Sequence, residues 1–145
     1  MNTHTDARLM RPDARDVADL VTRLMADYGE RAQTSHAARD QHSHGEGLAD
    51  AGMPDVVVFP HTNDEVAAIV RLCHAARVPV IAFGVGTSLE GHVAALYGGV
   101  CVDLSQMNRV LEVNAEDLAC TRQSRSSAFT SRTRSSRDRS RLTPP

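Results

Sequence analysis

The chain has 145 residues, which is enough for one domain of ordinary size and little more. It is 41% hydrophobic and 23% charged with a net charge of −2, as in soluble globular domains, and no apolar run reaches the roughly 18 residues that a membrane span needs. Three cysteines without a C-x-x-C pair argue against a disulfide framework or a cysteine zinc site, and the absence of a secretory pattern at the N-terminus predicts a cytoplasmic location.

The first part of the chain is predicted to contain one amphipathic helix. Residues 1–12 are polar and are expected to be disordered. From Asp13 to Tyr28, apolar residues recur at steps of three and four, which places them on one helical face, and Gly29 is a stop signal. The polar face mixes both charges, which favours docking on the protein body over membrane binding. Residues 34–52 have no apolar period and are predicted to be a loop.

Short apolar runs further along the chain indicate a small parallel sheet. The runs are apolar throughout and are separated by a helix, as expected where both faces of each strand are covered. Strands are predicted at 56–59, 80–82 and 100–102, and further extended pieces at 110–113 and 118–120.

The helix between the first two strands has clear end signals. Thr62 and Glu65 have capping-box spacing, and the helix should end near Arg77, because the residue before a proline avoids helical backbone angles. Its apolar face is predicted to consist of Val66, Ile69, Val70 and Cys73.

A glycine-rich loop directly after the second strand is the most informative motif. Residues 83–92 read Phe-Gly-Val-Gly-Thr-Ser-Leu-Glu-Gly-His. Glycines allow a sharp turn and a close approach to a ligand, and successive backbone N–H groups form a concave site for a phosphate. The segment does not match the phosphate loop of nucleoside triphosphatases, because His92 and Val93 stand where that motif has Lys and a hydroxyl residue. It matches the dinucleotide-binding fingerprint only in part, because Leu89 stands where that motif has its third glycine. From spacing alone, a phosphate loop and an unliganded turn stay equally open.

Four segments together resemble one protein family. They are PDVVVFP (54–60), TNDEV (62–66), VPVIAFGVGTSLEGH (78–92) and VDLSQMNRVLEV (102–113). In this order they are similar to FAD-linked oxidases and dehydrogenases with a p-cresol-methylhydroxylase-type FAD-binding domain. Within that family, the D-lactate dehydrogenase and glycolate oxidase D-subunit branch is the most similar, over roughly residues 35–121.

The resemblance implies an α+β fold, namely the first subdomain of that FAD-binding domain, with a small parallel sheet and flanking helices. It implies FAD as cofactor, with the pyrophosphate held by backbone N–H groups of the glycine loop. Family members oxidise a D-2-hydroxy acid to a 2-oxo acid and pass a hydride to the flavin. The positions that the resemblance assigns to FAD are Pro60, Phe83, Gly84, Val85, Gly86, Thr87, Ser88, Leu89, Gly91 and His92.

The resemblance predicts three parts in the chain. Residues 1–33 are an N-terminal extension with the amphipathic helix, 34–121 a partial FAD-binding domain, and 122–145 a disordered Arg/Ser-rich tail. The tail carries seven arginines and one aspartate, whereas residues 1–121 carry nine arginines and seventeen acidic residues. Disorder is favoured over a nucleic-acid arm, because no folded motif accompanies the charge.

A shift of the reading frame is an alternative origin for the tail. The family continues with a Val-x-Pro-Gly-Val segment after the position of Thr121. Codons exist for residues 122–127 that read Val-Asn-Pro-Gly-Val one base later, so the tail is compatible with out-of-frame translation.

The sequence therefore predicts a truncated, FAD-binding part of a flavin-dependent oxidoreductase. The resemblance places the catalytic part in sequence that this chain lacks, so no catalytic residue is assigned, and a 2-hydroxy acid would be a substrate only of the full-length relative. Apolar surface that a second subdomain normally covers should favour association. A stand-alone nucleotide-binding or subunit-interaction module is the alternative.

Other candidate residues have simpler interpretations. Cys73 and Cys101 are expected in the core, His61 and His74 at the surface, and Asp103 as the cap of a turn. A cluster of metal-ligand types lies in the polar segment before the first strand, but that segment lacks the fixed geometry of a metal site, so no metal is predicted. Its members are His36, His42, His44, Glu46 and Asp50.

Overall fold

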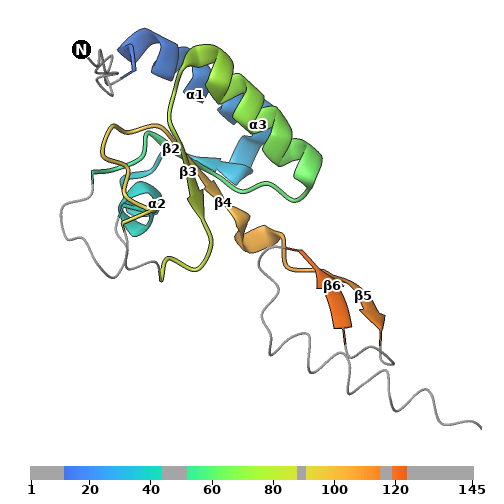
Figure 1. The fold of residues 1–145 in the computed structure, drawn as a ribbon. Coiled ribbons are helices and arrows are strands. Elements are labelled where there is room, and N and C mark those ends of the chain that lie inside the picture. Colours follow the sequence, from blue (N-terminus) through green and yellow to red (C-terminus); the bar gives the residue numbers. More distant parts are fainter. Residues whose placement is uncertain (1–11, 44–51, 88–90, 115–118, 124–145) are drawn as a thin grey trace, which may run out of the picture.

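The computed structural model describes residues 12–43, 52–87, 91–114 and 119–123 (Figure 1). Helices and strands alternate up to residue 83, a further strand follows at residues 100–103, and a hairpin comes last. In chain order the elements are α1 (Ala14–Tyr28), the 3-10 helix η1 (Gly29–Arg31), β1 (Ala32–Gln33), α2 (His36–Gln41), β2 (Val56–Val58), α3 (Asn63–Ala76), β3 (Val80–Phe83), β4 (Val100–Asp103), the 3-10 helix η2 (Leu104–Gln106), β5 (Val110–Asn114) and β6 (Ala119–Arg122).

The main sheet has four strands in the order β1-β2-β4-β3. Strands β2, β4 and β3 are parallel, with Val57 and Ile81 both aligned with Cys101, which confirms the predicted parallel sheet. Strand β1 adds an antiparallel edge beside β2. Strand β1 was not predicted, because two residues are too few to show any hydrophobic period.

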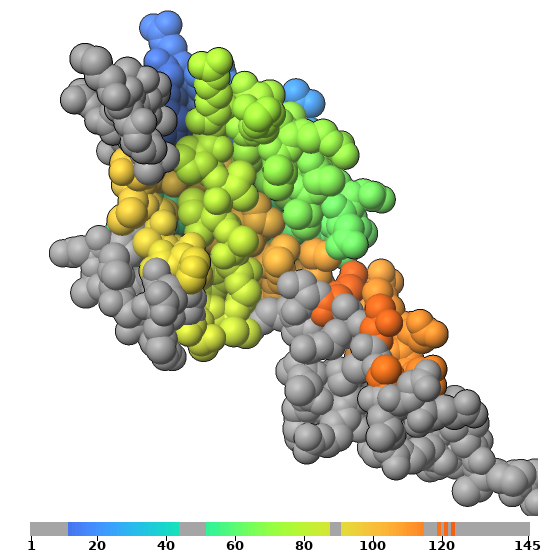
Figure 2. All heavy atoms as spheres, viewed as in Figure 1, coloured from blue at the N-terminus to red at the C-terminus, as the bar shows by residue number. Residues whose placement is uncertain are grey.

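Helices α1 and α3 cover one face of this sheet (Figures 1 and 2). Leu24 of α1 and Ile69 of α3 are fully buried among the inward side chains of β2 and β4. The docking of α1 follows from its apolar stripe, as predicted. The predicted face of α3 is confirmed at Ile69 and Cys73, which are fully buried, and wrong at Val70, which is 43% exposed.

The central strands and the edge strand differ in burial. Val56, Val57 and Val58 are all fully buried, so both faces of β2 are covered as predicted. The same expectation is wrong for β3, where Val80 is 40% exposed. Strand β3 lies at the edge of the sheet, and continuous apolar sequence does not distinguish an edge strand from a central one.

The predicted helix ends are confirmed. Gly29 ends α1 with a φ of 56°, and Arg77 ends α3 in the left-handed region with a φ of 54°. At the start of α3, the Glu65 N–H donates to Thr62 Oγ1 at 3.2 Å. The Glu65 carboxylate accepts from the N–H of His61 at 2.6 Å, one residue earlier than a regular capping box.

The prediction of a loop over 34–52 is wrong for α2. Ser35 caps this helix by accepting from the N–H of Ala38 at 3.3 Å, and Ala38 is buried. The helix was missed because six residues with one buried position show no period. Residues 44–51 lie outside the described part of the chain.

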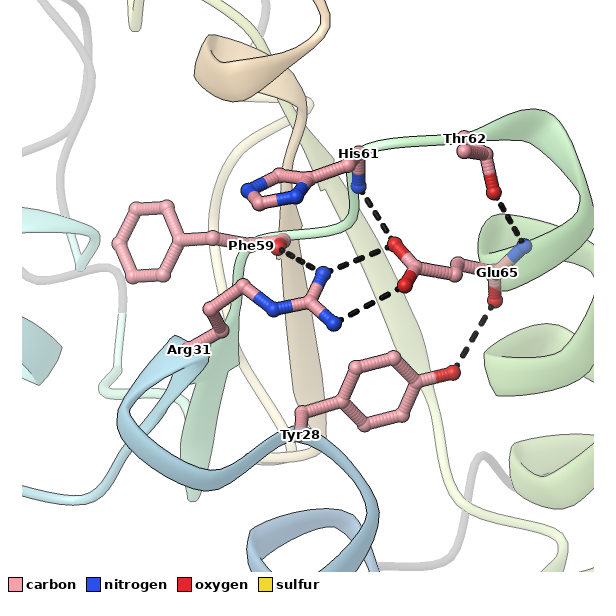
Figure 3. A network of polar contacts seen from close by, with 6 residues as sticks. All are labelled: Tyr28, Arg31, Phe59, His61, Thr62 and Glu65. Atoms are coloured by element: carbon pink, nitrogen blue, oxygen red, sulfur yellow. Dashed lines mark hydrogen bonds and ion pairs between the residues drawn. The ribbon is translucent and has the colours of Figure 1, made fainter.

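A polar network joins the end of α1 to the start of α3 (Figure 3). The Arg31 guanidinium donates two hydrogen bonds of 2.9 Å to the Glu65 carboxylate, and the Tyr28 hydroxyl donates to the Glu65 carbonyl at 3.4 Å. The hydrogen bonds from Arg31, together with the N–H of His61, lower the pKa of Glu65 to about 2 despite partial burial. The network ties the N-terminal segment to the rest of the sheet.

Strands β5 and β6 form a separate antiparallel hairpin that extends away from the main sheet (Figures 1 and 2). Both extended pieces were predicted, and β6 runs to Arg122, one residue into the predicted tail. Gln123 still belongs to this pairing, since its N–H donates to the Arg109 carbonyl at 2.8 Å. The predicted disorder of the tail falls almost wholly on residues 124–145, outside the described part, as does the predicted disorder of residues 1–11. Within the described part, no helix combines the length and apolarity that a membrane span requires.

Candidate functional site

A cavity of about 430 Å³ lies where the three parallel strands end. The loops after β2, β3 and β4 meet at this edge of the sheet, the usual place for a ligand in open α/β sheets. Helix α2 supplies a further wall. The lining residues are Gln41, His42, Phe59, Phe83, Gly84, Val85, Gly86, Asp103 and Ser105.

The glycine loop forms one side of this cavity and shows why two glycines are needed. Gly86 has a φ of 74°, and a Cβ there would lie 2.9 Å from Cζ of Phe83. Gly84 differs, since a Cβ would meet nothing within 4 Å, so its backbone is open to a ligand. No described residue accepts a hydrogen bond from the N–H groups of Val85, Gly86 or Thr87. The loop can therefore donate several backbone hydrogen bonds to an anion.

A buried ion pair forms the floor of the cavity. His42 Nε2 lies 2.8 Å from Asp103 Oδ2, and His42 Nδ1 lies 2.7 Å from the carbonyl oxygen of Ala38. The side chains of His42 and Asp103 are only 5% and 7% exposed. The imidazole also contacts two aromatic rings, with centroids 4.5 Å from Phe83 and 5.9 Å from Phe59.

The surroundings shift the pKa values of this pair apart. Burial by itself lowers the pKa of His42, but the hydrogen bonds to Asp103 and the Ala38 carbonyl, with the charge of Asp103, raise it above its ordinary value. Burial by itself raises the pKa of Asp103, but the hydrogen bonds from His42 and Ser105 lower it. Both shifts favour an imidazolium beside a carboxylate.

Asp103 has a second partner in the turn that follows β4. Its Oδ1 accepts from the N–H of Ser105 at 2.6 Å, which caps η2 and confirms the predicted capping role. The carboxylate therefore holds α2, β4 and η2 together at one point. Sequence reasoning found the cap but not the partner His42.

The structure brings only some of the predicted FAD positions to the cavity. Phe83, Gly84, Val85 and Gly86 line it, and Thr87 follows directly. The remaining positions lie elsewhere or outside the described residues. Pro60 is fully buried, His92 is exposed, Gly91 is half-buried with a φ of 73°, and Ser88 and Leu89 lie outside the described residues.

Five lining residues were not among the predicted FAD positions. They are Gln41, His42, Phe59, Asp103 and Ser105. Phe59, Asp103 and Ser105 follow the carboxyl ends of parallel strands, so this position rule could have found them. Gln41 and His42 lie in the segment that was predicted to be a loop, where His42 was noted only as a metal-ligand type, so no signal placed them at the ends of the strands.

The other candidates have structural roles. Cys73 and Cys101 are buried as predicted, and burial raises the pKa values of their thiols to about 11 and about 12. His61 and His74 are exposed as predicted. Of the metal-ligand types noted in the polar segment, His36 is exposed on α2, and His44, Glu46 and Asp50 are not described. Among the described residues, no three His, Cys, Asp or Glu side chains form a group that could hold a metal.

Comparisons with known proteins agree with this geometry. The FAD binding domain family matches residues 54–124. The chain is 45% identical over 92 residues to the probable mitochondrial D-lactate dehydrogenase of Danio rerio, covering 63% of this chain and 18% of that protein. It is 34% identical over 92 residues to the glycolate oxidase subunit GlcD of Bacillus subtilis, covering 63% of this chain and 20% of that protein.

Solved structures show the same arrangement. An alkyldihydroxyacetonephosphate synthase matches with a TM-score of 0.64 and 27% identity, over 71% of this chain and 23% of that chain. The 4-ethylphenol oxidase from Gulosibacter chungangensis matches with a TM-score of 0.62 and 27% identity, over 74% and 22%. The p-cresol methylhydroxylase structure has a TM-score of 0.57 at 19% identity over 70% and 21%, which supports the fold alone.

Fold and comparisons together define a class: part of an FAD-binding domain with the p-cresol-methylhydroxylase-type fold. Residues 54–124 belong to the FAD binding domain family, the chain is similar to D-lactate dehydrogenases and glycolate oxidase subunits, and FAD is the cofactor of this domain. The chain spans about a fifth of the length of these curated relatives. Because some relatives are named as mitochondrial, the cytoplasmic location stays a prediction.

Proposed function

We propose that the cavity at the carboxyl ends of the parallel strands holds the pyrophosphate of FAD. The observation that carries this proposal is the glycine loop. The backbone at Gly84 is open, and the N–H groups of Val85, Gly86 and Thr87 donate to no described residue. Several consecutive N–H donors suit a diphosphate, even though no Lys or Arg is among the described residues that line the cavity. The remaining positions assigned by resemblance stay part of the proposed FAD site; they are Pro60, Ser88, Leu89, Gly91 and His92.

We further propose that the complete enzyme oxidises a D-2-hydroxy acid to a 2-oxo acid. Bound FAD would supply the acceptor for the hydride. The residues of this chain would bind and orient the cofactor and exclude water from its phosphates. Among the described residues, His42 is the one imidazole that lines the cavity, and both of its nitrogens are already engaged, so it is not available as a general base. We therefore expect no turnover by the 145-residue chain alone.

The visible spectrum of the purified chain tests the binding proposal. The full chain is incubated with FAD and desalted, and retained absorbance in the flavin bands is the expected result. The matched control is Gly84→Val, which places a side chain on the open face of the loop and should lose most of the retained flavin. A colourless wild-type chain would contradict the proposal and would favour a subunit-interaction module.

A dye-reduction assay tests the activity proposal on the same sample. With D-lactate or glycolate added to the flavin-loaded chain, no dye reduction is expected. Turnover above the rate of free FAD would show that the described residues, or those next to them, also bind substrate.

We propose that the FAD-binding part lies within residues 34–121, after an N-terminal extension, and that residues 122–145 add nothing to it. Two findings bear on this division: α1 shares the core of the sheet, and the family match reaches residue 124. A chain ending at Gln123 should therefore retain as much flavin as the full chain. Reading the gene one base later tests the origin of the tail, and a frame without a flavoprotein-like continuation would refute the frame shift.

A further inference from the structure

The hydrogen bonds of His42 define its charge. A neutral imidazole carries one N–H, yet both ring nitrogens of His42 lie within 2.8 Å of oxygen atoms. The Ala38 carbonyl can only accept a hydrogen bond. In the Asp103 carboxylate, Oδ1 accepts from the N–H of Ser105, and Oδ2 faces His42. A ring nitrogen without a proton would point its lone pair at one of these acceptor oxygens. The repulsion between them would be strong, because His42 is only 4% exposed. The geometry therefore places one proton on Nδ1 and one between Nε2 and Asp103 Oδ2, and the raised pKa of His42 beside the lowered pKa of Asp103 favours the doubly protonated imidazole.

The position of the pair makes this charge matter for a ligand. Asp103 lines the cavity together with the glycine loop, so an uncompensated carboxylate would face the same space as the donors of the loop. Two negative groups within such a cavity repel strongly, because the effective dielectric constant is lower than that of water. An imidazolium in direct contact with Asp103 cancels that repulsion.

No other described charge replaces His42. On α2, Arg39 donates to the Pro54 carbonyl at 2.6 Å, and Asp40 is exposed. The loops after β2 and β3 contribute Phe59 and Phe83 to the surroundings of His42, and neither ring carries a charge. Cys101 on β4 is a neutral thiol, and the turn after β4 adds only the uncharged Ser105.

We propose that His42 is a positioning and charge-balancing residue of the cofactor cavity, which admits the anionic pyrophosphate of FAD only while His42 is protonated and paired with Asp103. This inference rests on the proposed function. It assigns to α2, which lies outside the segment that the family matches, a part in cofactor binding. It also predicts that the affinity for FAD falls as pH rises through the pKa of His42, although the diphosphate keeps its charge.

The test is a set of four full-length variants whose affinity for FAD is measured by flavin fluorescence at pH 6.5. His42→Gln leaves the Asp103 charge uncompensated, so we expect its affinity to fall about tenfold. His42→Gln with Asp103→Asn removes both charges and should recover most of that loss. Asp103→Asn alone should not weaken binding. His74→Gln, at an exposed position on α3, is the matched control and should bind like the wild type.

The double variant separates charge balance from simple packing. If it binds as weakly as His42→Gln, or if wild-type affinity stays constant between pH 6 and pH 9, the proposal is overturned. Nitrogen-15 histidine spectra of the unliganded chain report the imidazolium directly, and a neutral His42 at pH 6.5 would also overturn it. Wild-type protein that binds no FAD would instead refute the proposed function, whatever the spectra show.

Discussion

Two ion pairs attach the N-terminal segment to the sheet, and they differ in surroundings more than in chemistry. Arg31 and Glu65 lie on the helix-covered side with side chains 31% and 28% exposed. His42 and Asp103 lie at the cavity with side chains 5% and 7% exposed. In both pairs the carboxylate also accepts from a backbone N–H. The first pair is a forked contact, and the second is a single contact between largely buried side chains.

This difference in exposure predicts how strongly substitutions in each region affect stability. A partly exposed pair is screened by water and contributes modestly to stability. A buried pair leaves an uncompensated charge when one partner is removed, and the penalty is larger. We therefore expect substitutions on the helix-covered face to affect stability alone, and substitutions at the cavity to affect ligand binding as well.

The largest effect on stability is expected for Leu24→Ala on the helix-covered face. Leu24 is fully buried between α1 and the sheet, so the cavity left behind should lower the free energy of unfolding by about 3 kcal/mol. Urea denaturation measures the loss. Met25→Ala, where the side chain is 45% exposed, is the control and should change stability little. Equal effects of the two variants would show that α1 does not dock as described.

A smaller loss of about 2 kcal/mol is expected for His42→Gln, because Asp103 then keeps a buried charge without its cation. The pKa shifts also set a pH dependence. The raised pKa of His42 makes its contribution complete below pH 6.5 and lost as pH rises through the pKa in the folded state. The lowered pKa of Asp103 makes its contribution complete above pH 3.8 and lost as pH falls further.

Chemical denaturation at several pH values checks this dependence. The difference in stability between the wild type and the His42→Gln variant should be largest between about pH 4 and pH 6.5. A difference that grows above pH 8 would contradict the ion pair.

The glycine loop offers a test in which stability and binding separate. Gly86→Ala should cost about 1.5 kcal/mol, because it combines a φ of 74° with a contact of 2.9 Å to the Phe83 ring. Gly84→Ala meets no atom within 4 Å and should leave stability nearly unchanged while weakening retention of FAD. Thermal melts and the desalting assay measure the two effects. If Gly84→Ala unfolds as readily as Gly86→Ala, the contrast between the two glycines is wrong.

The smallest effect is expected for Glu65→Gln on the helix-covered side. Loss of the forked contact with Arg31 should lower stability by about 1 kcal/mol at neutral pH, with screening by solvent included. The pKa of Glu65 is lowered from 4.5 to about 2, so its contribution is present above pH 4.5 and lost as pH falls through about 2. Affinity for FAD should not change. If Glu65→Gln binds FAD more weakly while its stability is unchanged, the expected difference between the two regions is wrong.

The sequence by itself determined the local elements and the family. Periodicity and end signals placed α1, α3 and three parallel strands, because helix faces, caps and prolines act within a few residues. The glycine loop and the segments around it identified the FAD-binding domain for the same reason, since a phosphate loop is built from consecutive backbone N–H groups.

Only the tertiary structure decided what depends on distant contacts. It placed β3 at the edge, turned Val70 outward, formed the short helix α2 and paired His42 with Asp103, 61 positions apart in the chain. A side chain's burial and charge depend on which segments fold against it. A histidine in a polar stretch therefore shows its role only once the ends of the parallel strands surround it.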